Sequence, residues 1–169
     1  MINWLIDHWH IAQLIPMFAA QKITMELKNI ASLSGKSGLF KIVSPTKSGV
    51  ILESLDEAKT KLVTSSNQRV SILSEISIFT TTKEGNIPLL EVLKKIKKDF
   101  TGNLGVDANS EPKELKAFLK SVLPEYDEAK VYVSDMKKLV KWYGILSQYA
   151  PEVFETETEN KKNPEEGKS

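Results

Sequence analysis

The chain has 169 residues, a formal net charge of +1 and no cysteine. A net charge this small gives no general attraction to nucleic acids or anionic membranes. Without cysteine, disulfide bonds, thiolate metal sites and thiol nucleophiles are all excluded. Hydrophobic residues make up 41% and charged residues 27% of the chain, a balance typical of one globular domain or two small ones. The composition fits a reducing compartment, and we expect a cytoplasmic protein.

Residues 1–24 differ from the rest of the chain. The first lysine is Lys22, and polar residues such as Asp7 and His8 interrupt the apolar run. The segment is therefore a poor secretory signal and a poor membrane span. Two interpretations stay open: an amphipathic surface helix, or a mis-assigned start with translation beginning at Met25. We favour the second and treat the segment as a doubtful leader.

Short apolar runs separated by turns predict a small β module over residues 25–82. Each run is rich in Ile, Val, Leu or Phe, and the runs are residues 39–43, 50–55, 61–64 and 76–80. The first two form a hairpin with Thr46–Gly49 at its tip. Residues 69–75 are either a strand or one helical turn, and the same choice holds for Leu27–Ala31. Four or five short strands at about ten-residue spacing are typical of an SH3-like barrel.

Apolar residues then recur at three- and four-residue steps, which predicts a helical module over residues 86–154. The first helix opens at Pro88, with Asn86 as its cap. Ser110 caps the second helix, and the third begins at Ser134. The expected fold class is therefore α+β, a small SH3-like β-barrel followed by a three-helix module. Residues 155–169 contain almost no apolar side chain and predict a disordered tail.

Two apparent ligand-binding motifs are incomplete. Gly35-Lys36-Ser37 resembles the end of a phosphate loop, but Ile30 stands where a glycine is required and no clear helix follows. Asp107 begins a spacing like that of a calcium loop, but Pro112 occupies the position of the required glycine. We expect no catalytic residue, no cofactor and no metal, and hence no enzyme.

Two lysine clusters are the candidate nucleic-acid contacts. They are Lys94, Lys95, Lys97 and Lys98 on the first expected helix, and Lys137, Lys138 and Lys141 on the third. Lysines neutralise phosphates, and the neighbouring Trp142 offers a ring on which a base can stack. The alternative is that both clusters are solvated faces of amphipathic helices, with Trp142 packed inward.

Five segments share the pattern of a known family: residues 27–40, 50–56, 70–79, 123–127 and 131–143. With them, the chain resembles small two-domain proteins of Bacteroidota that are classified only as domains of unknown function. The resemblance covers the chain from about Met25 to Tyr149 and leaves the leader outside. It implies a two-part architecture, and it supplies no activity, cofactor or catalytic residue.

Together these observations predict a non-enzymatic cytoplasmic binding or adaptor protein that contacts RNA or a ribonucleoprotein, with no membrane partner. The alternative is a protein–protein interaction module that does not touch nucleic acid. An enzyme that uses carboxylates alone is a third hypothesis. The sequence predicts neither the identity of the partner nor the oligomeric state.

Overall fold

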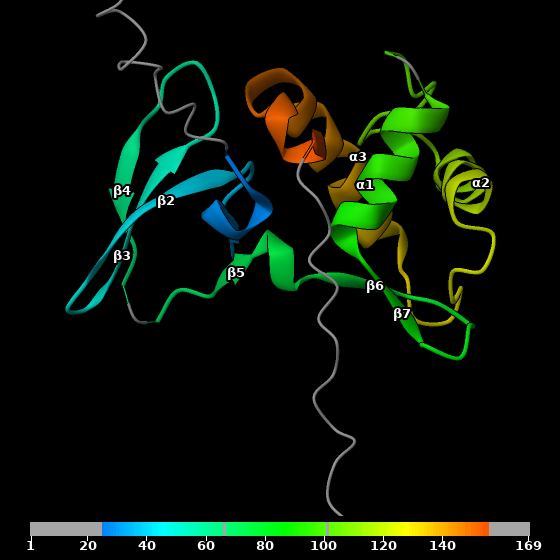
Figure 1. Ribbon diagram of the computed structural model, residues 1–169, viewed down its shortest axis with the longest axis horizontal. Coiled ribbons are helices and arrows are strands. Elements are labelled where there is room, and N and C mark those ends of the chain that lie inside the picture. Colours follow the sequence, from blue (N-terminus) through cyan, green and yellow to red (C-terminus); the bar gives the residue numbers. More distant parts are fainter. Residues whose placement is uncertain (1–24, 66, 101, 156–169) are drawn as a thin grey trace, which may run out of the picture.

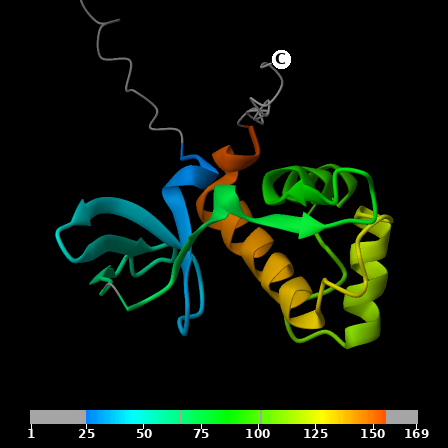
Figure 2. The ribbon, with the colours of Figure 1, turned by 90° about the horizontal axis from the view of Figure 1, so that it is seen from below.

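The computed structural model describes residues 25–65, 67–100 and 102–155. The predicted leader and the tail beyond Glu155 lie outside the described residues. The described chain is α+β, with a five-stranded sheet on one side, two helices on the other, and α3 between them (Figures 1 and 2). The strands are β1 (Ile30–Leu33), β2 (Phe40–Thr46), β3 (Gly49–Ser54), β4 (Lys61–Val63), β5 (Val70–Ile72), β6 (Ser77–Phe79) and β7 (Asn86–Pro88). The helices are α1 (Leu89–Asp99), α2 (Pro112–Val122) and α3 (Val133–Tyr149), with short 3-10 helices η1 (Leu27–Asn29), η2 (Leu73–Glu75) and η3 (Pro151–Glu155).

The large sheet is antiparallel and has the strand order β4-β3-β2-β1-β5. Its edge strands, β4 and β5, do not pair with each other, so the sheet is open. A barrel requires its two edges to join. The closed SH3-like barrel is therefore not confirmed, whereas the α+β class is.

Local predictions for this sheet are confirmed. The hairpin forms from β2 and β3, with Thr46 opposite Gly49 beside the turn. Residues 69–75 combine both alternatives, because the strand β5 runs directly into the 3-10 turn η2. Leu27–Ala31 does the same in reverse order, with η1 leading into β1.

One predicted strand belongs elsewhere. The run 76–80 forms β6, which pairs with β7 in a separate two-stranded sheet rather than with the large sheet. The intervening turn η2 separates β6 from β5, and Phe79 lies opposite Asn86 in the new ladder. Asn86 is thus a strand residue and does not cap α1, whose N-cap is Pro88.

The three predicted helices are present, with different caps for the second and third. The N-cap of α2 is Glu111 rather than Ser110, and the Glu114 carboxylate accepts the Glu111 N–H at 3.1 Å. Helix α3 begins one residue before the predicted Ser134, and its N-cap is Tyr132. A carboxylate in the first turn satisfies a backbone donor that the helix itself leaves unpaired.

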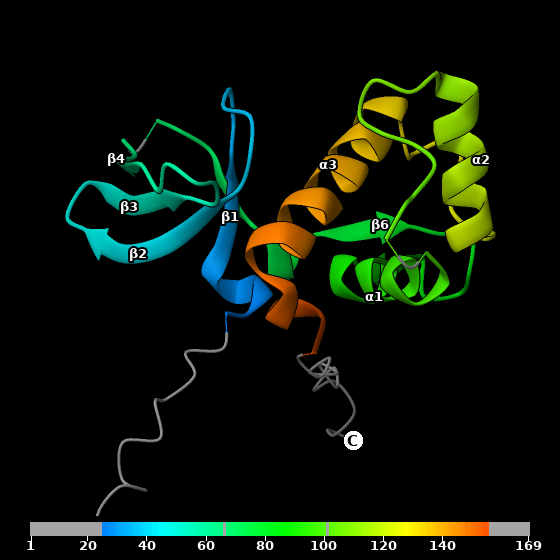
Figure 3. The same cartoon turned by 90° about the horizontal axis from the view of Figure 1, so that it is seen from above.

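The main hydrophobic core joins the sheet to the helices. Leu39, Leu55 and Leu73 from the sheet side belong to the same buried cluster as the apolar faces of the three helices. A second, smaller cluster of Leu33, Phe40 and Leu52 lies within the sheet. Of the three α-helices, α3 lies nearest the sheet, and β1 faces it (Figure 3). In the described part of the chain, no helix has the length and apolarity needed to cross a membrane.

Candidate functional site: a cationic cleft between sheet and helix

A cavity of about 680 Å³ separates the edge of the large sheet from α3, a volume in the range of small-ligand sites. We call it the sheet–helix cleft. One wall consists of β1, the β1–β2 loop and the start of β5, which contribute residues 32–38, Arg69 and Ser71. Helix α3 forms the opposite wall, Ile76 and β6 line another side, and Leu89 of α1 and Leu119 of α2 also reach the cavity. The cleft thus exists only because distant parts of the sequence meet.

Positive charge dominates the polar lining of the cleft. The charged lining residues are Lys36, Arg69, Lys130, Lys138 and Lys141, together with the carboxylate of Asp135. Lys138 pairs with Asp135 at 3.3 Å, and Lys130 pairs with Asp127 at the same distance. The Lys138–Asp135 pair is exposed, and such a pair contributes roughly 0–1 kcal/mol, so it does not hold Lys138 firmly. In the described chain, Lys36, Arg69 and Lys141 form no ion pair.

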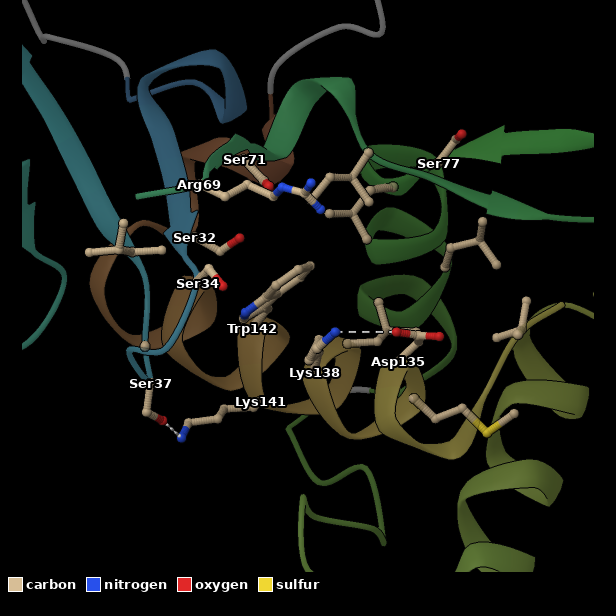
Figure 4. Close-up of a pocket in the computed structure, with 18 of the residues that line it drawn as sticks. Ser32, Ser34, Ser37, Arg69, Ser71, Ser77, Asp135, Lys138, Lys141 and Trp142 are labelled. Atoms are coloured by element: carbon tan, nitrogen blue, oxygen red, sulfur yellow. Dashed lines mark hydrogen bonds and ion pairs between the residues drawn. The ribbon is translucent and has the colours of Figure 1, made fainter. Parts of the chain in front are cut away.

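Trp142 supplies an aromatic surface in the cleft. Its half-buried side chain packs against the main core and also lines the cavity. Figure 4 shows the indole on α3 and the Arg69 side chain reaching into the cavity from the sheet side. The inward packing considered from the sequence is therefore only part of its environment.

The sheet wall and the helix wall touch through one polar contact. The Lys141 ammonium donates a hydrogen bond to the Ser37 hydroxyl, from α3 to the β1–β2 loop (Figure 4). On the sheet side, the Ser34 N–H donates to the Arg69 carbonyl oxygen at 3.0 Å. These bonds fix the loop between two cations that are far apart in the sequence.

The seven predicted lysines lie on different surfaces. Lys138 and Lys141 line the cleft, whereas Lys137, the preceding α3 residue, does not. None of the α1 cluster, Lys94, Lys95, Lys97 and Lys98, lines the cleft. The Lys97 ammonium lies 5.0 Å from the centroid of the Phe154 ring. Contact with nucleic acid stays a prediction for all seven.

Sequence reasoning missed Arg69 and Lys36. Arg69 is the only arginine in the sequence, and its guanidinium suits phosphate better than a lysine does. The occurrence of a single arginine in the chain was a signal by which sequence analysis could have picked out Arg69. Lys36 lies in the motif that failed as a phosphate loop, and the reason for that failure holds, since β2 rather than a helix follows the loop.

A structured turn supports the helix side of the cleft. The Asp127 carboxylate accepts the Ala129 N–H at 3.0 Å, and this bond, with help from Lys130, holds the pKa of Asp127 below its usual value. Burial raises the pKa of the neighbouring Tyr126, and Glu128 raises it further. The contacts of Asp127 stabilise the turn before α3.

A protein metal site needs several ligand side chains close together. Within the residues that the structure describes, no group of three His, Cys, Asp or Glu side chains is placed to hold a metal ion. The expectations of no metal, no cofactor and no catalysis stay predictions.

The fold and the cleft define an α+β protein with a cationic, partly aromatic cavity, and comparisons with known proteins place it in a family. Residues 27–73 match a family described as "Domain of unknown function (DUF5606)", and residues 76–146 match "Domain of unknown function (DUF6852)". A protein from Bacteroides vulgatus, a structural-genomics target solved by solution NMR, is 36% identical. The match covers 78% of this chain and 89% of that chain, with a TM-score of 0.56.

The chain therefore belongs to this two-part family of unknown function, as its sequence pattern predicted. Among proteins of curated function, none matches it. Neither the family nor the solved relative supplies an activity or a ligand.

Proposed function

We propose that this chain is a non-enzymatic binding protein that holds single-stranded RNA in the sheet–helix cleft and acts as an adaptor in the cytoplasm of a Bacteroidota host. The observation that carries the proposal is the lining of the cleft, where cations from both walls surround a half-buried tryptophan. Phosphates supply the matching negative charge, and stacking on an aromatic side chain contributes about 1–3 kcal/mol per base.

The size and position of the cavity favour a single strand. A cavity of about 680 Å³ accepts a short stretch of nucleotides, whereas a duplex keeps its bases paired and out of reach of Trp142. The net charge of +1 also favours a local site over general attraction to polyanions. Lys138 and Lys141 are the cluster residues best placed for the contact, because they stand beside Trp142 on the cleft wall.

The first test is binding of a short, fluorescein-labelled single-stranded RNA, followed by anisotropy. K138E/K141E should weaken binding by about tenfold or more, and the salt-dependence slope should fall by about 0.7 for each phosphate that the variant no longer neutralises. Trp142→Ala should cost about 1–3 kcal/mol. Full affinity in all these variants would rule out RNA binding in the cleft.

Two charge-matched variants serve as controls. K113E/K116E changes two exposed lysines of α2 that lie outside the cleft, and it should leave binding nearly unchanged. K95E/K98E tests the α1 cluster with the same change in charge. A loss as large as that of K138E/K141E would add α1 to the contact surface.

A second candidate function, protein–protein interaction, has its own observation. Val43 and Val63 are 44% and 64% exposed on the large sheet, and Val63 lies opposite Ile51 in the β3–β4 ladder. Exposed apolar side chains on a sheet suit a protein partner better than a phosphate backbone. This function predicts a nuclease-resistant partner that the wild-type chain retains from lysate and V43K/V63K does not.

A further inference from the structure

The β1–β2 loop, Ser34–Gly38, is an exposed wall of the cleft, and each of its residues lines the cavity. Gly35 and Gly38 have positive φ angles of 79° and 104°, a backbone conformation that glycine adopts at little cost. Nothing lies within 4 Å of where a Cβ would stand on either glycine. The space beside both glycines is therefore open.

Some backbone N–H groups of this loop donate a hydrogen bond within the protein, and others do not. The Ser34 N–H bonds to Arg69, and the Lys36 N–H donates to the Leu33 carbonyl oxygen at 3.1 Å. Among the described residues, the N–H groups of Gly35, Ser37 and Gly38 have no acceptor. Turns that expose neighbouring N–H groups in this way form concave anion sites.

Cations flank the same loop. The Lys141 ammonium is joined to it through the Ser37 hydroxyl. Lys36 stands on the loop itself. Only the backbone carbonyl of Arg69 bonds to the loop, and the Arg69 guanidinium lies on the other side of Trp142 (Figure 4). Lysine ammonium groups bind phosphate as compact positive charges. Position, charge and donor type therefore agree on a tetrahedral oxyanion.

We propose that the β1–β2 loop, with Lys36 and Lys141, forms a phosphate subsite, so that the ligand unit in the cleft is a nucleoside phosphate with its base on Trp142. This inference rests on the proposed function and specifies how the cleft recognises one nucleotide. The recognised unit is the same in a free nucleotide and in an RNA strand.

The spatial arrangement supports this division of the cleft. In Figure 4, the side chains of Ser32, Ser34 and Arg69 enter the cavity from the sheet wall, and Trp142 enters it from α3. The apolar part of the lining includes Ile76, Met136 and Leu139, which suits a base rather than a second phosphate. Trp142 thus lies beside Ser34 and between the Arg69 guanidinium and the Ser37–Lys141 contact (Figure 4).

The test compares inorganic phosphate, uridine 5′-monophosphate and uridine, each added to the full chain and followed through its amide NMR spectrum. Phosphate and the monophosphate should shift the amides of Gly35, Ser37 and Gly38. The monophosphate should bind about tenfold more tightly than uridine, the effect of one charged hydrogen bond. The affinity for labelled single-stranded RNA, measured in parallel, shows whether the cleft also binds the nucleotide as part of a strand.

The deciding variant is K36Q/K141Q, which removes the two exposed cations at the loop and keeps its backbone. It should lose most of the difference in affinity between the monophosphate and uridine, while K113Q/K116Q on α2 keeps that difference.

Equal binding of the two probes by the wild-type chain, or phosphate shifts outside the loop, would overturn the subsite. If RNA still bound in the cleft, the proposed function would stand without the phosphate subsite. If neither RNA nor the monophosphate bound, both proposals would fail.

Discussion

Asp127 determines the turn that places Lys130 and Val131 at the cleft. Its carboxylate accepts the Ala129 N–H and pairs with Lys130 at 3.3 Å, while its own N–H donates to the Phe79 carbonyl oxygen at 2.9 Å. These contacts favour the ionised carboxylate in the folded chain. Asp127 is thus a residue whose charge stabilises the path of the chain rather than a reacting group.

The lowered pKa of Asp127 has a defined consequence for stability. A carboxyl group whose pKa is lower in the folded state stabilises that state above the unfolded pKa, near 3.8, and this contribution disappears as the pH falls through the folded value. Asp127→Asn should therefore unfold at a lower temperature than wild type at pH 7. The difference should become smaller as the pH is lowered below 3.8, as measured by circular dichroism. An equal difference above and below that pH would contradict a role for the charge.

At the scale of the element, two glycines have opposite roles. A Cβ on Gly49, at the start of β3, would lie 1.8 Å from the carbonyl oxygen of Thr64. Thr64 is buried and bonds through its hydroxyl to both the N–H and the carbonyl of Val50. Gly144 is an exposed residue of α3 with nothing within 4 Å of its Cβ position.

Gly49→Ala should therefore destabilise the protein by about 1–3 kcal/mol, because the backbone must shift to relieve the overlap. Gly144→Ala should stabilise it by roughly 1 kcal/mol, because alanine favours the helix. Urea unfolding measures both changes. Equal stability of the two variants would show that neither local environment is as described.

Elements whose pattern is local could be predicted. The β2–β3 hairpin and the three helices follow from short-range periodicity and turns, and each is present. The caps predicted at Asn86 and Ser110 are wrong, because both residues have other partners in the structure. Asn86 pairs with Phe79 in a strand, and the Ser110 hydroxyl accepts the Asp107 N–H at 2.9 Å instead.

At the scale of the whole molecule, neither closure of the sheet nor the cleft could be deduced from periodicity. An SH3-like barrel needs β4 to meet β5, and spacing along the chain contains no information on that pairing. The cleft unites residues 32–38, Arg69 and residues 130–142. Only its α3 lysines and Trp142 stand in a recognisable cluster, so the sequence predicts that part of the site alone.

The shared core makes the cleft a property of the whole chain. Leu39, Leu55 and Leu73 pack in one cluster with the helices, which holds the sheet wall against the α3 wall. The cations of the two walls therefore face one cavity without a partner chain. This arrangement is the physical basis for the claim that the cleft, and not the exposed α1 surface, receives RNA.

The most direct test of that claim is an amide NMR titration of the full chain with a short single-stranded RNA. The account predicts chemical-shift changes concentrated at residues 32–38, at Arg69 and along α3 from Asp135 to Trp142. Changes confined to Lys94–Lys98 of α1, or a spectrum that RNA leaves unaltered, would contradict it.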